Sequence, residues 1–308
     1  MNNFLKKVGI WFLLVAGVHI WLGFYANGFT DPFYLRFASP KQSSLIIGSS
    51  RAAQGLVPHV LDSVIDQCDD GFYNFAFTVA HSPYGPVYFN AIKSKLKQNE
   101  NCHGLHIVTV NPWSLSSITK DPEDVSKFRE NNLALGNTKF FNLNPNYFYL
   151  LNNYNQGWFN LLKSDNDSYE LMEDGWLRIN VNMSERTINS RTESKVKHYQ
   201  EKNMPNSTLS NTRIFYLIET IKLLQESGKV FLVRLPVGQE ILNIENVLSP
   251  SFNHLMDSIS TRHEISYFDF TDHEGGFTFT DGNHLYHKSS KKFSELVGNN
   301  IKKDMEGI

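Results

Sequence analysis

The stretch Ser44-Leu45-Ile46-Ile47-Gly48-Ser49-Ser50-Arg51 decides the fold of this chain. A short apolar run that ends in glycine is typical of a strand buried on both faces of a parallel sheet. The Gly-Ser-Ser that follows predicts a tight strand-to-helix turn at the carboxyl edge of the sheet, where open α/β sheets bind their ligands. A serine in such a turn is exposed, and nearby helix amides point toward a developing oxyanion. Glycine and serine are also ordinary turn and N-cap residues, so the motif alone equally allows a plain turn.

The segments that follow alternate between strand and helix patterns. Further apolar strands are expected at 72–77, 105–110, 230–235 and 265–270. Helical spacing is found at 57–65, 86–96, 213–227, 253–261 and 289–302. This rhythm with short links predicts an α/β fold, a doubly wound and mostly parallel five-stranded sheet in three α/β/α layers.

Residues 113–211 interrupt the rhythm. They are rich in Asn, Tyr and Phe and contain short helical pieces but no long apolar strand. A segment of this length inside a compact domain is usually an inserted subdomain or a cover over the site. Packing at the sheet edge and a lid or substrate surface are equally compatible with this composition.

The N-terminus contains an apolar run from Val8 to Phe24, with His19 as its one titratable group. As a helix it would be roughly 26 Å long, close to the thickness of a hydrocarbon core. Lys6 and Lys7 precede it and Arg36 is the next basic residue, so the N-terminus is expected in the cytoplasm and the rest outside. We expect a single-pass anchor at 1–26, a juxtamembrane linker at 27–43 and the α/β domain at 44–308. A cleaved signal peptide and a buried core helix are the alternatives.

The composition excludes several classes of protein. With 308 residues, 41% hydrophobic, the chain is too apolar for a disordered protein. A net charge of −2 argues against a nucleic-acid partner. A mean hydropathy of −0.33 excludes a polytopic membrane protein but not a single span. Cys68 and Cys102 each precede a predicted strand, so one disulfide and two free thiols both fit, and no metal or cofactor motif is present.

A second motif lies before the last helix, at Asp281-Gly282-Asn283-His284. A carboxylate three residues before a histidine can orient the imidazole through Nδ1 and leave Nε2 free as a base toward a serine. A polar Asx turn would have the same sequence. His273 and His287 nearby lack the helical His-x-x-x-His spacing of a metal site.

Together, Gly-Ser-Ser-Arg after the first strand and Asp-Gly-Asn-His near the C-terminus resemble the SGNH/GDSL hydrolase superfamily, which has a flavodoxin-like frame. The resemblance covers about 44–302, apart from the insertion. It implies Ser50 as the nucleophile, with Ser49 where the family has aspartate, and Asp281 and His284 as the remaining triad residues. The stretch LIIGSSRAAQGLVPHVLD also looks like membrane-anchored bacterial relatives of the D-alanylation and alginate O-acetylation proteins.

The resemblance implies an extracytoplasmic serine esterase or O-acyltransferase without a cofactor. Its substrate would be an acylated envelope glycan or polymer, and an integral-membrane acyl donor protein is a further implied partner. The oxyanion would be held by the Ser50 amide and Asn111, which stands where the family's third block has its asparagine. Arg51 and Gly85 are candidates for substrate binding, although pairing with a nearby acid is the simpler role for Arg51.

The sequence departs from the family in its second and third blocks. No glycine follows the second strand before Gly85, and Pro112 stands after Asn111 in place of aspartate. These departures motivate an alternative function, a catalytically inactive envelope module that binds a carbohydrate or a partner membrane protein.

Overall fold

A computed structural model describes residues 2–65, 71–97, 103–163, 165–272 and 276–307. Five strands form one parallel sheet in the order β2-β1-β3-β8-β9. They are β1 (Ser44–Ile47), β2 (Phe72–Asn74), β3 (Gly104–Thr109), β8 (Gly228–Arg234) and β9 (Ser266–Asp269). This sheet confirms the predicted α/β class. Cys68 and Cys102 lie outside the described residues.

The register places alternate side chains of β1 on opposite faces of the sheet. Leu45 pairs with Tyr73 of β2, and Ile46 pairs with Ile107 of β3. Leu45 and Ile47 join the core on one face, while Ile46 joins the core on the other. All four residues of β1 are buried, which explains why this strand has a continuous apolar sequence.

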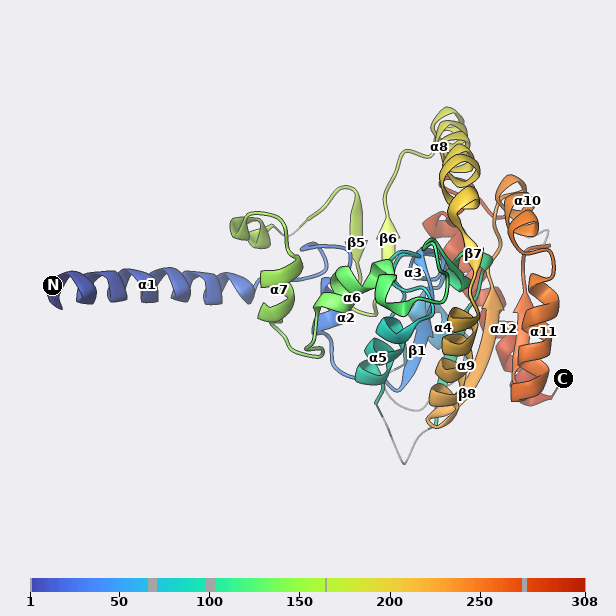
Figure 1. Cartoon of the computed structure of the whole chain (residues 1–308), viewed down its shortest axis with the longest axis horizontal. Coiled ribbons are helices and arrows are strands. Elements are labelled where there is room, and N and C mark those ends of the chain that lie inside the picture. The colour runs from blue at the N-terminus through green and yellow to red at the C-terminus, as the bar shows by residue number, and fades with distance from the viewer. Residues whose placement is uncertain (1, 66–70, 98–102, 164, 273–275, 308) are drawn as a thin grey trace.

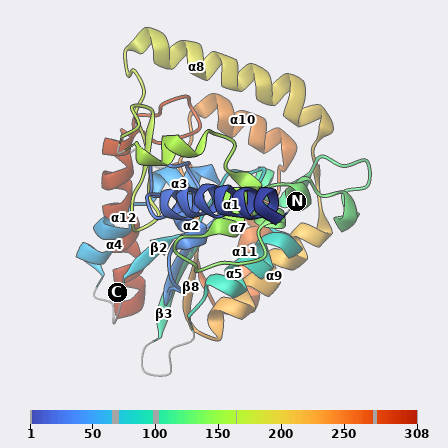
Figure 2. The ribbon, with the colours of Figure 1, turned by 90° about the vertical axis from the view of Figure 1, so that its left-hand side faces the viewer.

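Helices cover both faces of the sheet (Figure 2). One layer contains α3 (Ser50–Gly55), α4 (Pro58–Val64) and α12 (His287–Glu306). The other contains α5 (Pro86–Lys95), α9 (Asn211–Gln225) and α11 (Phe252–His263). One further helix, α10 (Gln239–Leu248), follows β8 and has no counterpart among the predicted elements.

The segment 113–211 consists mainly of short elements. Its helices of four or more residues are η1 (Pro112–Leu115), η3 (Arg129–Asn132), α6 (Ala134–Asn137), α7 (Tyr147–Asn153), η4 (Trp158–Leu162), α8 (Glu185–His198) and the π-helical η5 (Tyr199–Asn203). The shorter η2 and η6 are Val125–Lys127 and Met204–Asn206. Its strands pair in two small sheets, β4 (Ser116–Ser117) with β7 (Thr208–Leu209) and β5 (Tyr169–Leu171) with β6 (Leu177–Ile179).

Helix α1 (Asn2–Gly23) projects away from the domain as a single rod (Figure 1). It is long and apolar enough to cross a membrane, and very little of it is buried against the rest of the chain. The residues that follow, expected as a linker, are folded into the domain. Helix α2 (Tyr34–Ala38) buries Tyr34 and Phe37 completely.

Arg36 of α2 is also fully buried. Its guanidinium donates hydrogen bonds to the carbonyl oxygens of Asn74, Pro32 and Gly175. It therefore ties the chain that leaves α1 to the end of β2 and to the turn between β5 and β6.

Candidate functional site

Ser50 is the first residue of α3, at the turn that follows β1. Gly48 in this turn has φ +147°, and a Cβ there would lie 1.8 Å from Thr109 Oγ1 of β3. Only glycine fits so close an approach in that conformation. Ser49 is buried in the turn, whereas Ser50 is partly exposed. The tight turn therefore presents the Ser50 hydroxyl at the carboxyl edge of the sheet.

The second predicted motif forms a compact loop before α12. Asp281 Oδ1 accepts hydrogen bonds from the backbone N–H groups of Asn283 (3.1 Å) and His284 (2.9 Å). Gly282 has φ +72°, which permits this turn. His284 Nδ1 lies 3.0 Å from both carboxylate oxygens of Asp281.

The two motifs, separated by more than two hundred residues, meet at this edge. Ser50 Oγ lies 2.9 Å from His284 Nε2. The structure thus brings Ser50, His284 and Asp281 into one continuous hydrogen-bonded chain, in the order that a nucleophile, a base and an orienting carboxylate require.

The charge of Asp281 follows from its surroundings. Burial alone would raise the pKa of this carboxyl, but the hydrogen bonds and charges of His284 and Lys195 hold it well below its usual range. An ionised Asp281 accepts the Nδ1–H of His284, and this tautomer leaves the Nε2 lone pair facing the Ser50 hydroxyl. The Asn283 amide lies 3.2 Å from the same Nε2 atom.

Arg51 and Asn283, the neighbours of Ser50 and His284 in sequence, bind one another. Arg51 Nη2 and Nε donate to Asn283 Oδ1 at 2.6 and 3.0 Å. Arg51 Nη2 also donates to Glu245 Oε1 of α10 at 2.5 Å, and Arg234 Nη2 donates to Glu245 Oε2 at 3.2 Å. Both arginines and Glu245 are almost fully buried. Arg51 therefore has an acidic partner inside the protein, one that the sequence did not reveal because α10 was not predicted.

Asn111 and Gly85, the other predicted site residues, have different surroundings. The Asn111 side-chain amide donates to Ser49 Oγ at 3.3 Å, and its carbonyl accepts from the N–H of Ser114. Gly85 precedes α5, and a Cβ there would meet Glu130 and Arg213. The structure thus places Asn111 beside the turn that carries Ser50, and Gly85 beside a buried ion pair.

Helix α8 covers the Asp281–His284 loop. Lys195 Nζ lies 3.1 Å from Asp281 Oδ2, and Arg191 Nε donates to the carbonyl oxygen of Thr280 at 2.8 Å. A Cβ on Gly282 would lie 2.9 Å from the Thr192 side chain. Sequence reasoning missed these three residues because α8 buries none of its side chains and has no apolar stripe to mark it.

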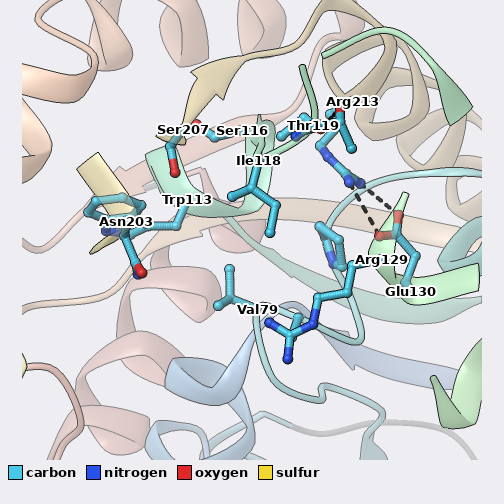
Figure 3. Close-up of a pocket in the computed structure, with 13 residues that line it drawn as sticks. Val79, Trp113, Ser116, Ile118, Thr119, Arg129, Glu130, Asn203, Ser207 and Arg213 are labelled. Carbon is cyan, nitrogen blue, oxygen red and sulfur yellow. Dashed lines mark hydrogen bonds and ion pairs between the residues drawn. The ribbon is translucent and has the colours of Figure 1, made fainter. Parts of the chain in front are cut away.

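A small cavity of about 120 Å³ opens at the same edge of the sheet (Figure 3). Val79 and Ala80 from the loop after β2 and Trp113 after β3 line one part of it. Another side of the cavity is lined by Arg213 and Glu130, which form an ion pair with 2.8 Å between Arg213 Nη1 and Glu130 Oε1. The Trp113 ring stacks on Tyr199 at 4.7 Å; burial raises the pKa of the Tyr199 hydroxyl, and the nearby charge of Arg51 lowers it. Tyr199 therefore lies between the cavity wall and Arg51, the residue after Ser50.

Among the described residues there is no group of three side chains of the kind that hold a metal. His273, which the sequence places in this region, lies outside them. The site as described consists of a hydroxyl, an imidazole and a carboxylate.

Comparisons with known proteins give little beyond this geometry. No family model matches the chain, and no curated protein matches its sequence. Among solved structures, the inhibitor-bound aryl esterase of M. smegmatis aligns with a TM-score of 0.36 and 9% identity, over 84% of this chain and 98% of that one. The function is therefore inferred from the site itself.

Proposed function

We propose that the chain is a membrane-anchored serine esterase or O-acyltransferase of SGNH type. One observation carries this proposal, the 2.9 Å contact between Ser50 Oγ and His284 Nε2 with Asp281 on the far side of the imidazole. A plain turn would not place an aligned imidazole and an ionised carboxylate behind a partly exposed serine hydroxyl.

In the proposed reaction, Ser50 Oγ attacks the carbonyl carbon of an acyl ester while its proton passes to His284 Nε2. The imidazolium is stabilised by Asp281, and it returns the proton to the departing alkoxide as the ester C–O bond breaks. The acyl group is then held on Ser50. A water or a sugar hydroxyl attacks it, transfers its proton to His284, and regenerates the Ser50 hydroxyl with release of an acid or a new ester. The Ser50 amide and Asn111 are the proposed donors to the oxyanion.

The proposed substrate is an acyl ester of an envelope glycan or polymer outside the cytoplasm. Support comes from α1, which can anchor the domain at a membrane, and from the cavity at the same edge of the sheet as Ser50. Trp113 offers an aromatic surface there and Arg129 a positive charge, which suit a sugar and an anionic substituent. An integral-membrane acyl donor would be needed for the transferase form.

The test is covalent labelling of the full chain with a fluorophosphonate probe, followed by mass spectrometry. We expect one adduct, on Ser50, which is lost in Ser50→Ala and retained in Ser63→Ala, a control at an exposed serine of α4. Incubation of the labelled and unlabelled protein with p-nitrophenyl acetate should show that the adduct blocks ester hydrolysis.

A binding module without activity is the second candidate. It is favoured by the Asn111 amide, which already donates to Ser49, and by the lack of a glycine between Asn74 and Tyr84. A folded chain with no adduct on Ser50 and no esterase activity would overturn the enzyme proposal and leave the module.

A further inference from the structure

Two short helices of the insertion pack directly against the last turn of α1. Tyr147 of α7 donates a hydrogen bond from Oη to the carbonyl oxygen of Ile20 at 2.6 Å. Its ring occupies the space that a Cβ on Gly23 would need, with a closest approach of 2.3 Å. The ring of Trp158 in η4 lies 5.1 Å from the ring of His19. Figure 1 shows α7 beside the end of α1, so these elements share the level of residues 19–23.

The outer side of these helices, together with the segment just before α7, exposes large apolar side chains. We call them the interfacial patch: Phe140, Leu143, Phe148, Leu151, Phe159 and Leu162. The most exposed are Leu151 (71%) and Phe159 (73%).

The patch is built from matched positions on the two helices. Phe148 and Leu151 are three residues apart on α7, and Phe159 and Leu162 are three apart on the 3₁₀ helix η4, where that spacing puts side chains on one side. Leu150 and Leu161, by contrast, are buried in the domain. Each helix thus has one apolar side toward the core and another toward the surroundings.

The charge pattern separates this surface from an ordinary aqueous one. Residues 140–162 contain no Asp, Glu, Lys, Arg or His, although about four of these positions would be charged at the chain-wide share of 19%. Lys139 and Lys163 flank the uncharged run. Aromatic rings and neutral polar residues bounded by lysines are typical of chain that lies at a membrane–water interface.

We propose that the interfacial patch rests in the headgroup and upper acyl region of the bilayer that α1 crosses, so that the protein contacts the membrane at two places. The occupant is lipid, because the patch continues the exposed apolar surface of α1 at the level where that helix leaves the hydrocarbon. A second copy of the chain or another membrane protein would compete for the same surface. This inference is independent of the proposed chemistry.

The test uses the full chain in phosphatidylcholine nanodiscs, with Cys68→Ser and Cys102→Ser and one nitroxide-labelled cysteine. The labels are placed at Leu151→Cys or Phe159→Cys, with Leu13→Cys in α1 and Val247→Cys in α10 as references. Val247 is the matched control, since its side chain is exposed (68%) and belongs to a different surface. The measurement is the ratio of collisions with oxygen to collisions with a water-soluble nickel chelate.

We expect the ratios at 151 and 159 to be several-fold above that at 247 and below that at 13. Equal ratios at 151, 159 and 247 would overturn the proposal, as would a water-exposed label at 13. Immobile labels shielded from both reagents would also overturn it, because a protein would then cover the patch. The unmodified chain supplies a second readout: a lipid with a diazirine near its headgroup should crosslink to residues 140–162 and leave α10 free. Adducts confined to α1 would count against lipid at the patch.

Discussion

At the residue scale, the candidate site is held together by the side chains next to its reactive groups. Arg51 follows Ser50 and Asn283 precedes His284, and the hydrogen bonds between Arg51 and Asn283 fix the distance between the two motifs. Glu245 in turn pairs with both Arg51 and Arg234, and Asp269 is a second acidic partner of Arg234. Arg51 and Asn283 thus link the two motifs by hydrogen bonds, a contact that becomes visible only once the motifs are adjacent in space.

Glu245→Gln should therefore be strongly destabilising. It would leave the buried guanidinium of Arg51 without its counter-charge and Arg234 with only the more distant Asp269 (3.7 Å), and breaking a buried pair in this way costs about 3–5 kcal/mol. Urea unfolding of the full chain in detergent micelles measures the change. Glu219→Gln removes an exposed partner of Lys222 and should lower the free energy of unfolding by less than about 1 kcal/mol. Equal losses in the two variants would show that the buried pair is not important for stability.

At the element scale, the sequence predicted the elements that form the apolar core and missed the helices that are held mainly by polar contacts. The five strands lie where apolar runs placed them, since strands in the interior of a parallel sheet are mostly apolar, as the fully buried β1 and its neighbour β3 show. The Ser50 and Asp281–His284 motifs were found because their residue types suit acyl chemistry. Helices α8 and α10 were missed, α8 because it has no apolar stripe and α10 because it lies in a short stretch between two stronger patterns. Both helices carry residues that contact the candidate site, so the sequence predicted the three candidate triad residues but not the side chains packed around them.

Helix α8 should loosen when its ion pair with the loop is removed. Lys195 and Asp281 form a partly exposed pair, worth roughly 0.5–1 kcal/mol, so Lys195→Met should speed amide exchange in α8 by about two- to fivefold. Hydrogen-exchange mass spectrometry measures this, with α9 as the internal reference. Lys197→Met removes a pair with Glu201 that is mostly exposed, and it should leave the rates unchanged. High salt should reproduce the Lys195→Met effect in the unmodified chain, because it screens the pair. Unchanged exchange in Lys195→Met would mean that the Arg191–Thr280 hydrogen bond and packing at Thr192 hold the helix without the ion pair.

At the scale of the whole molecule, the sheet core contains a neutral histidine that makes stability depend on pH. His106 of β3 is fully buried, accepts the Leu45 N–H at Nδ1 (3.3 Å) and lies 3.0 Å from Ser227 Oγ. Burial lowers its pKa from 6.5 to about 3. As pH falls below 6.5, His106 becomes protonated in the unfolded chain but stays neutral in the folded chain. Stability is therefore lost progressively between pH 6.5 and about 3.

This loss should reach about 1.4 kcal/mol per pH unit from His106 alone. In His106→Gln the slope of unfolding free energy against pH, measured in micelles from pH 7 to 4.5, should be smaller by that amount. His254→Gln, at an exposed position of α11, should keep the original slope. Only the slopes of unfolding free energy against pH are compared. A loss of stability in His106→Gln that is the same at every pH therefore does not affect the result. Parallel lines for all three proteins would contradict the assignment.

The buried Arg36 also limits how far the α/β domain can move relative to helix α1. A catalytic domain on a loose tether explores a hemisphere around its anchor and meets polymers at any height within that radius. Here the chain passes from α1 into α2, and the Arg36 guanidinium of α2 donates to the carbonyl oxygens of Asn74 and Gly175 in the domain, so the segment between α1 and the domain is fixed in place. We expect the Ser50 hydroxyl to stay at a nearly constant distance from the bilayer surface. Such a protein would discriminate between chemically identical esters by their distance from the membrane.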